Sequence, residues 1–172
     1  MEPAACPTLT RGRYAYDFGD TAHLTPLVKM HTLGSSYVPP GFHAGGLRYH
    51  GMAPMLSHIT DLGYIKPRAY QQLGCFAAGL QFAQAEGILP APEANHAVKG
   101  AIDEALRCKE EGVSRCILFN LCGHGHFDMQ AYRDYMEFRR IDYHPTGPKF
   151  PPDGGVPAAT TSQVDCNVSS AQ

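Results

Sequence analysis

Apolar side chains recur at helical spacing in one part of the chain more clearly than elsewhere. Positions i, i+3, i+4 and i+7 share one side of a helix, and the residues that follow this rule are Ala94, Ala97, Val98, Ala101, Ile102, Ala105 and Leu106. Glu93 precedes this stripe, where the helix dipole favours a carboxylate. Lys109 and Gly112 follow it, as is typical of a helix end. The pattern predicts an amphipathic helix with one buried stripe.

A continuous apolar run comes next and ends in a glycine-rich turn. We predict a buried strand over Arg115 to Leu121 and a loop over residues 122–127. Asp128 is a good N-cap for a helix that runs to about Phe138. In an α/β sheet, the loop between the carboxyl end of a strand and a helix is the usual place for a ligand. This stretch is therefore the first candidate for a functional site.

The first half of the chain gives weaker patterns. Residues 52–62 and 69–85 are predicted to form two helices that serve mainly for packing. Residues 1–51 are rich in Gly, Pro, Tyr and His and show no sustained period, which predicts mostly loop with short extended pieces. A loop of that length indicates either a cover over a site or a region that packs against further chain.

Length and composition set the expected domain organisation. A chain of 172 residues is long enough for one domain with a core and short for two. From Tyr143 on, Pro, Gly, Ser and Thr dominate without an apolar period, which is typical of disorder. We therefore expect an α/β domain over residues 1–142 and a disordered tail over residues 143–172.

Charge narrows the class of partner. A formal net charge of -2 and a pI near 6.5 provide no basic field for nucleic acid or an anionic membrane. The longest strongly apolar run, Ile117 to Leu121, is far shorter than the roughly 20 residues of a membrane span. No secretion signal accompanies the six cysteines, so we expect reduced thiols in a cytoplasmic protein. A small molecule or a protein is the expected partner.

The glycine-rich loop permits two kinds of chemistry of its own. His124, His126 and Asp128 alternate, so on an extended segment they would share a face and could bind zinc or iron in a metal-dependent hydrolase. The intervening glycines favour a turn instead, which separates the three side chains. Cys122 could alternatively act as a nucleophile with His124 as its base, although a spacing of two residues is poor geometry for that pair.

Two other polar features are open to more than one interpretation. Glu93 is either a site residue or an acid that stabilises the start of a helix. Residues 43–51, HAGGLRYHG, contain three glycines that permit close backbone approach to a ligand. The same residues are compatible with a tight surface turn.

Several motifs in the same order resemble one family. LFNLCGHGHFD (118–128) and EGILPAPEANHA (86–97) closely resemble the C-terminal part of the tryptophan synthase β chain, nearest to its second type. HAGGLRYHGMAP (43–54) and residues 2–31 are similar to the same subfamily, so the resemblance runs from about residue 2 to about 138. It implies part of a three-layer αβα domain of the fold type II of enzymes that use pyridoxal phosphate (PLP).

The resemblance also implies a reaction and site residues. The family joins L-serine and indole to give L-tryptophan and water, a carbon-oxygen lyase reaction in which PLP does the electronic work. Cys122 stands where the family usually has the Ser whose hydroxyl meets the pyridine nitrogen of PLP. Gly123 and His124 would lie beside the ring, Glu93 would approach it from a neighbouring loop, and Tyr49 would flank the indole route.

The chain also departs from the family pattern. The Schiff-base lysine, the catalytic glutamate and the Gly-Gly-Gly-Ser-Asn phosphate loop all precede the matched region in the family, so the resemblance assigns no catalytic residue here. We expect this chain alone neither to retain PLP nor to make tryptophan. A second hypothesis is a non-catalytic remnant that binds a protein partner, either an intact homologue or another copy. The location would be cytoplasmic, or plastid in a plant or alga.

Overall fold

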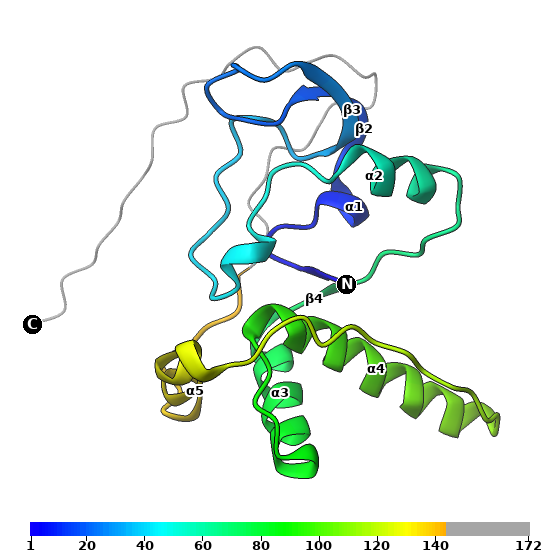
Figure 1. Ribbon diagram of the computed structural model, residues 1–172, viewed down its shortest axis with the longest axis vertical. Coiled ribbons are helices and arrows are strands. Elements are labelled where there is room, and N and C mark those ends of the chain that lie inside the picture. Colours follow the sequence, from blue (N-terminus) through cyan, green and yellow to red (C-terminus); the bar gives the residue numbers. More distant parts are fainter. Residues whose placement is uncertain (144–172) are drawn as a thin grey trace, which may run out of the picture.

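The structure of the chain is a computed structural model that describes residues 1–143 (Figure 1). Its elements are mixed helix and strand, and mostly helical. Figure 1 shows two groups, one around a β hairpin and one of three helices, with the first strand of the chain between them. The predicted tail lies outside the described residues, except for Tyr143.

The first group is built on an antiparallel hairpin. Strand β2 (Arg13–Phe18) pairs with β3 (Leu27–Thr32) along its whole length, and helices α1 (Thr8–Arg11) and α2 (Pro54–Asp61) lie beside the hairpin (Figure 1). The short 3-10 helix η1 (Gly45–Leu47) follows. Residues 1–51 are otherwise mostly loop, as predicted, and the strands of the hairpin are among the predicted short extended pieces. A small core in this part of the chain consists of Ala5, Cys6, Leu33, Phe42 and Ala44.

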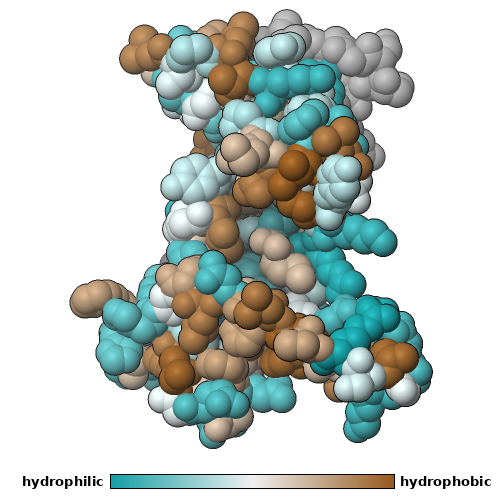
Figure 2. Space-filling view, turned by 45° about the vertical axis from the view of Figure 1, so that its right-hand side comes forward, coloured by the Kyte–Doolittle hydropathy of each residue, from teal (hydrophilic) through white to brown (hydrophobic). Residues whose placement is uncertain are grey.

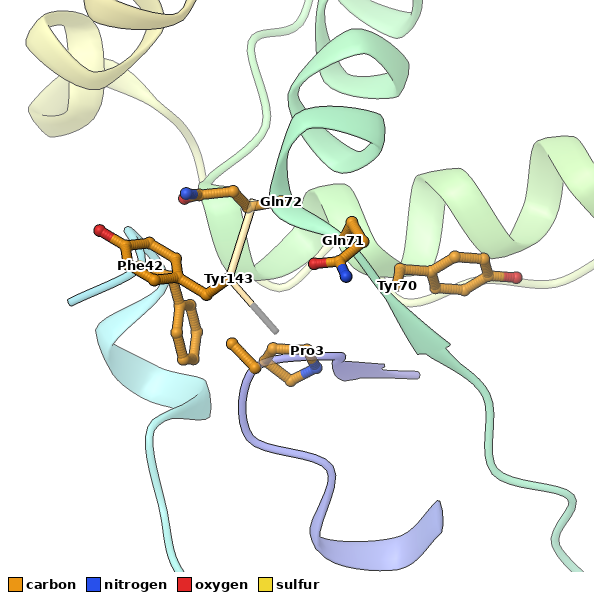
Figure 3. A pocket seen from close by; sticks show the side chains of 7 residues that line it. Pro3, Phe42, Tyr70, Gln71, Gln72 and Tyr143 are labelled. Atoms are coloured by element: carbon orange, nitrogen blue, oxygen red, sulfur yellow. The ribbon is translucent and has the colours of Figure 1, made fainter. Parts of the chain in front are cut away.

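A pair of two-residue strands connects the two groups. Strand β1 (Glu2–Pro3) runs parallel to β4 (Ala69–Tyr70). The Glu2 carboxylate is buried and accepts hydrogen bonds from the backbone N–H groups of Leu9 and Thr10, at 2.9 and 2.8 Å, in the short helix α1. Figure 3 shows the small pocket at this junction, into which Pro3 and Phe42 project from opposite sides and which Tyr143 also lines.

The second group consists of α3 (Gln72–Glu86), α4 (Pro92–Glu111) and α5 (Met129–Met136). Gly87 and Gly112 end the first two helices in the left-handed conformation, with φ of 70° and 65°. A β-carbon at Gly79 of α3 would collide with the Asn95 side chain of α4, so these two helices approach very closely. Phe76, Ala131 and Tyr132 form the core of this group.

The predicted helices at 52–62, 69–85 and 94–112 are confirmed within a few residues. The buried stripe of α4 is only partly confirmed, because Ala94 and Val98 are 1% exposed whereas Leu106 is 52% exposed. In this structure the stripe is covered only over the first half of the helix.

The predicted buried strand at Arg115 to Leu121 is wrong. The segment runs extended back along α4 (Figure 1), but it belongs to neither sheet, and the Leu118 side chain is 95% exposed. A strand needs a neighbour for its N–H and C=O groups, and no strand of residues 1–143 pairs with it. The described part holds two separate two-stranded sheets. The three-layer αβα arrangement is thus not present among these residues.

Two expectations from composition concern thiols and membranes. The cysteines at positions 6, 75, 108, 116 and 122 are all free thiols. None of the helices in the described range has the length and apolar character that crossing a membrane requires.

Candidate functional site

The glycine loop is bound to the segment that leads into α4. The N–H of Gly125 donates to the carbonyl of Leu89 at 2.7 Å, and the N–H of Ala91 donates to the carbonyl of Gly123 at 2.8 Å. His124 forms an isolated β bridge with Pro90 between these two bonds. Two motifs that are about 30 residues apart in the sequence therefore form one structural unit.

Small residues make this close approach possible. A β-carbon at Gly125 would lie 2.6 Å from the carbonyl oxygen of Pro90 and 3.0 Å from Cε2 of Tyr132. A β-carbon at Gly123 would lie 3.1 Å from the β-carbon of Ala91. The glycines are thus required by packing, and the turn that they form carries Cys122 and His124 on its exposed side.

A buried polar network supports the unit from below. The Tyr132 hydroxyl donates to the carbonyl of Pro90 at 2.5 Å and accepts from Nδ2 of Asn95 at 2.8 Å. Burial raises the pKa of Tyr132 to about 12, so the hydroxyl keeps its proton at neutral pH. Our sequence reasoning missed both residues. The sequence did contain a signal for this network. Asn95 lies next to the apolar stripe of α4, and a buried amide requires a hydrogen-bond partner.

Glu93 joins α4 to the segment of residues 43–51. Its Oε1 accepts the N–H of Gly46 at 3.0 Å, and a β-carbon at Gly46 would lie only 3.2 Å from Cγ of Glu93. Glu93 lies in the first turn of α4. This agrees with the interpretation that its carboxylate stabilises the start of the helix. It also brings a second glycine-rich segment to the same region, so the two interpretations are compatible.

Tyr49 lies three residues beyond Gly46 in that segment. Tyr49 is 63% exposed, and its carbonyl oxygen accepts a hydrogen bond from the Cys6 thiol at a sulfur-to-oxygen distance of 3.0 Å. Burial raises the pKa of Cys6 to about 11, so this thiol keeps its proton. The structure thus brings the backbone segment of Tyr49 to Glu93 and leaves the Tyr49 ring at the surface.

His43 binds the residue that was predicted to cap α5. Nε2 of His43 lies 2.7 Å from Oδ1 of Asp128. Asp128 does occupy the N-cap position of α5, but its carboxylate makes no capping hydrogen bond. The predicted cap is therefore correct in position and wrong in bonding, because the carboxylate turns to an imidazole 85 positions away in the sequence.

The three alternating residues do not form a metal site. The His124 and His126 ring centroids lie 4.6 Å apart, and Nδ1 of His124 accepts the backbone N–H of His126 at 3.2 Å. Asp128 is engaged with His43 instead. Over residues 1–143, no group of three or more His, Cys, Asp or Glu side chains could hold a metal ion. The metal-dependent hydrolase hypothesis thus finds no support in this geometry.

The nucleophile hypothesis fares no better. Cys122 is exposed, and within residues 1–143 no hydrogen bond joins its thiol to His124. Because Nδ1 of His124 accepts a backbone N–H, the proton of the neutral ring resides on Nε2. The arrangement presents an N–H donor and a thiol to a ligand from the same exposed loop.

His96 is a further buried histidine of the same motif. Its Nδ1 donates to the carbonyl of Pro92 at 3.0 Å, and its Nε2 has no hydrogen-bond partner among the described residues. Burial lowers the pKa of His96 below its usual value. The ring is therefore neutral and contributes to packing at the start of α4.

Glycine-lined loops with exposed polar groups beside the first turn of a helix are where α/β enzymes commonly hold ligands. No family model matches the chain. The chain is 60% identical over 142 residues to "Tryptophan synthase beta chain 2" of Aquifex aeolicus, and the match covers 83% of this chain and 33% of the relative. It is 57% identical over 135 residues to the protein of the same name from Methanosarcina acetivorans, covering 78% of this chain and 30% of the relative.

Over about 80% of its length the chain is thus similar to curated proteins named tryptophan synthase beta chain. It spans about a third of the length of the curated relatives that it matches, since the Pyrococcus abyssi protein is also covered to 33%.

Proposed function

We propose that this chain forms the ring-facing part of a PLP site of the tryptophan synthase β type. Cys122, Gly123 and His124 are assigned to the side of the cofactor ring, with Glu93 approaching from α4 and Tyr49 flanking the indole route. One observation carries the proposal. The hydrogen bonds between residues 89–91 and the glycine loop place the motif of Glu93 against the motif of Cys122.

The polar groups of the loop suit one side of a pyridine ring. When bound, PLP withdraws electrons from the amino-acid substrate. The exposed Cys122 thiol would meet the pyridine nitrogen, and a thiol is a weaker hydrogen-bond partner than the usual serine hydroxyl. Gly123 leaves room for the ring because it has no side chain, and His124 offers an Nε2 donor. The proposed activity of the whole family-type enzyme is tryptophan biosynthesis from L-serine and indole.

PLP also needs a lysine amine for its covalent bond and a cradle for its phosphate. Lys29 lies over the Tyr14 ring at 4.4 Å, and the Lys99 ammonium pairs with Asp103 at 2.5 Å. Among the described residues no ion pair or hydrogen bond joins a lysine to the glycine loop. The residues thus fit the ring and do not fit its covalent attachment. We propose that these 172 residues alone neither retain PLP nor make tryptophan.

Absorbance tests the second part of this proposal. The chain is incubated with PLP, dialysed and scanned for the band at about 410 nm that marks lysine-bound cofactor. The Aquifex aeolicus relative is the positive control. We expect no stable band from this chain, and a band that survives dialysis would overturn the proposal.

Alkylation tests the assignment of the ring-facing residues separately. Cys116 and Cys122 are both exposed thiols, six residues apart. Pyridoxine phosphate has the ring and phosphate of PLP but no aldehyde, so it cannot react with lysines. At millimolar concentration it should slow the reaction of Cys122 with iodoacetamide and leave that of Cys116 unchanged. Equal rates at Cys122 with and without the compound would contradict the assignment.

A further inference from the structure

The extended segment after α4 has the side-chain alternation of a β strand. Ile117, Phe119 and Leu121 are half-buried, whereas residues 116, 118 and 120 are exposed. Phe119 packs edge-on against Phe82 of α3 with ring centroids 5.7 Å apart. One face of the segment is thus fixed on the helices, and the other presents Leu118 to solvent.

Both backbone edges of this segment are free. None of the N–H or C=O groups of residues 114–122 forms a backbone hydrogen bond with another residue of the described range. An extended segment with unpaired edges and an apolar side is a template for strand addition. If both of its faces were buried, this segment would be an ordinary central strand of an α/β sheet.

A groove runs beside the same segment. Its volume is about 350 Å³, and it is lined by small residues of α4, namely Ala97, Gly100 and Ala101, with the Met1 side chain packed against Gly100. Met1, Arg68 and the segment itself form its walls. Figure 2 shows hydrophobic side chains spread over the lower, helical group on the face in view. Strand edge and groove together form one surface, which we call the strand-docking surface.

We propose that the strand-docking surface binds a sheet strand from the part of a tryptophan synthase β chain that this chain does not match. The relatives are about three times as long as the matched segment, which covers 33% of the Aquifex aeolicus protein. The unmatched part of such a relative is the partner that a segment with this sequence is expected to fit. The inference deepens the proposed function, because it names the partner of the same segment, and it depends on the family relationship.

A second copy of this chain is a poorer occupant. In each copy the inner face of the segment already packs on α3 and α4, through contacts such as Phe119 with Phe82. Two copies paired edge to edge would satisfy backbone groups, but both Leu118 side chains would stay in water. A partner that brings a sheet with its own helical layer covers both the edge and the outer face.

Co-expression tests the proposal. The tagged chain is produced together with the Aquifex aeolicus β chain 2 from which the matched third has been deleted, and complexes are measured by size-exclusion chromatography with light scattering. We expect a one-to-one complex. The full-length relative should not bind, because its own segment occupies the equivalent place.

Matched substitutions locate the contact. Leu118→Asp buries a charge in the complex and should weaken binding at least about tenfold. Leu24→Asp makes the same change at a side chain that is 86% exposed between β2 and β3, and it should bind as the original chain does. Because both leucines are exposed, neither change is expected to unfold the chain.

Several outcomes would overturn the proposal. These are no complex, a complex that Leu118→Asp leaves intact, or a deleted relative that stays insoluble in the presence of this chain. A homodimer of the chain alone that Leu118→Asp dissociates would assign the surface to a second copy instead. The mass measurement needs no PLP, and the protection of Cys122 needs no partner, so either proposal can fail without the other.

Discussion

Nε2 of His43 lies 2.7 Å from Oδ1 of Asp128 and joins the segment after the hairpin to the start of α5. The two side chains are 41% and 24% exposed, so solvent screens part of their attraction. The bond nevertheless joins the two groups of elements, together with those of Gly46 to Glu93 and of the His43 N–H to Oε1 of Gln72.

Removal of the Asp128 carboxylate should lower stability modestly. Asp128→Ala is expected to reduce the free energy of unfolding by about 1 kcal/mol, the usual net value of one hydrogen bond. His43→Gln retains a donor near the position of Nε2 and should lose less. Urea unfolding measures both changes. A double-mutant cycle with His43→Ala that shows no coupling would contradict a direct contribution of this pair.

Gly125→Ala should be more damaging. The new methyl group would meet the Pro90 carbonyl oxygen at 2.6 Å, which is backbone and cannot move away cheaply. We expect a loss of about 1–3 kcal/mol, as for other overpacked positions. Gly41→Ala is the matched control, because its methyl group would meet no atom within 4 Å. Equal urea midpoints for the two variants would refute the close approach of the loop to Pro90.

Tyr132→Phe removes only one buried oxygen atom. The change leaves the Pro90 carbonyl and the Asn95 amide without their partner, which should cost about 1–3 kcal/mol. Tyr135→Phe is the control. Its ring stacks on Phe76 at 5.6 Å, and its hydroxyl has no hydrogen bond to a described residue. Thermal or urea unfolding of both variants should separate them clearly, and similar stabilities would argue against the network.

Acid should destabilise the chain partly through His96. Burial lowers its pKa in the folded state below the unfolded value of about 6.5. Above that pH both states hold a neutral ring, and His96 adds no pH dependence. As the pH falls through about 6.5, the unfolded chain binds the proton first, so stability is lost. The measurement is the urea midpoint at pH 7.5 and pH 5.5, which should change less in His96→Asn than in the original chain.

Local sequence signals predicted the helices well and the strands badly. Gly112 and the acid at Glu93 mark both ends of α4 because these residues act through local backbone geometry and the dipole. The hairpin of β2 and β3 was missed because eight residues separate its strands, so no short turn signals the pairing. The run at Arg115 to Leu121 was predicted as a strand from its composition, but strand formation requires a neighbour that local sequence does not reveal.

The candidate site, too, could be predicted only in part from local sequence. The importance of the glycine loop and of Glu93 could be inferred from motifs, because each motif is contiguous. The contacts of His43 with Asp128 and of Asn95 with Tyr132 span 85 and 37 positions, and only the fold brings them together. Asp128 shows the limit most directly, since its position was predicted and its partner was not.

The contact of Gly79 with Asn95 has a consequence for how the helical group unfolds. Asn95 lies against α3 at Gly79, where that helix has no side chain, and its amide also holds Tyr132 of α5. Separation of α3 from α4 would therefore uncover the polar network that joins α4 to α5. The three should open together as one cooperative unit, with similar hydrogen-exchange rates for their protected amides. One asparagine side chain thus couples three helices into a single step of unfolding.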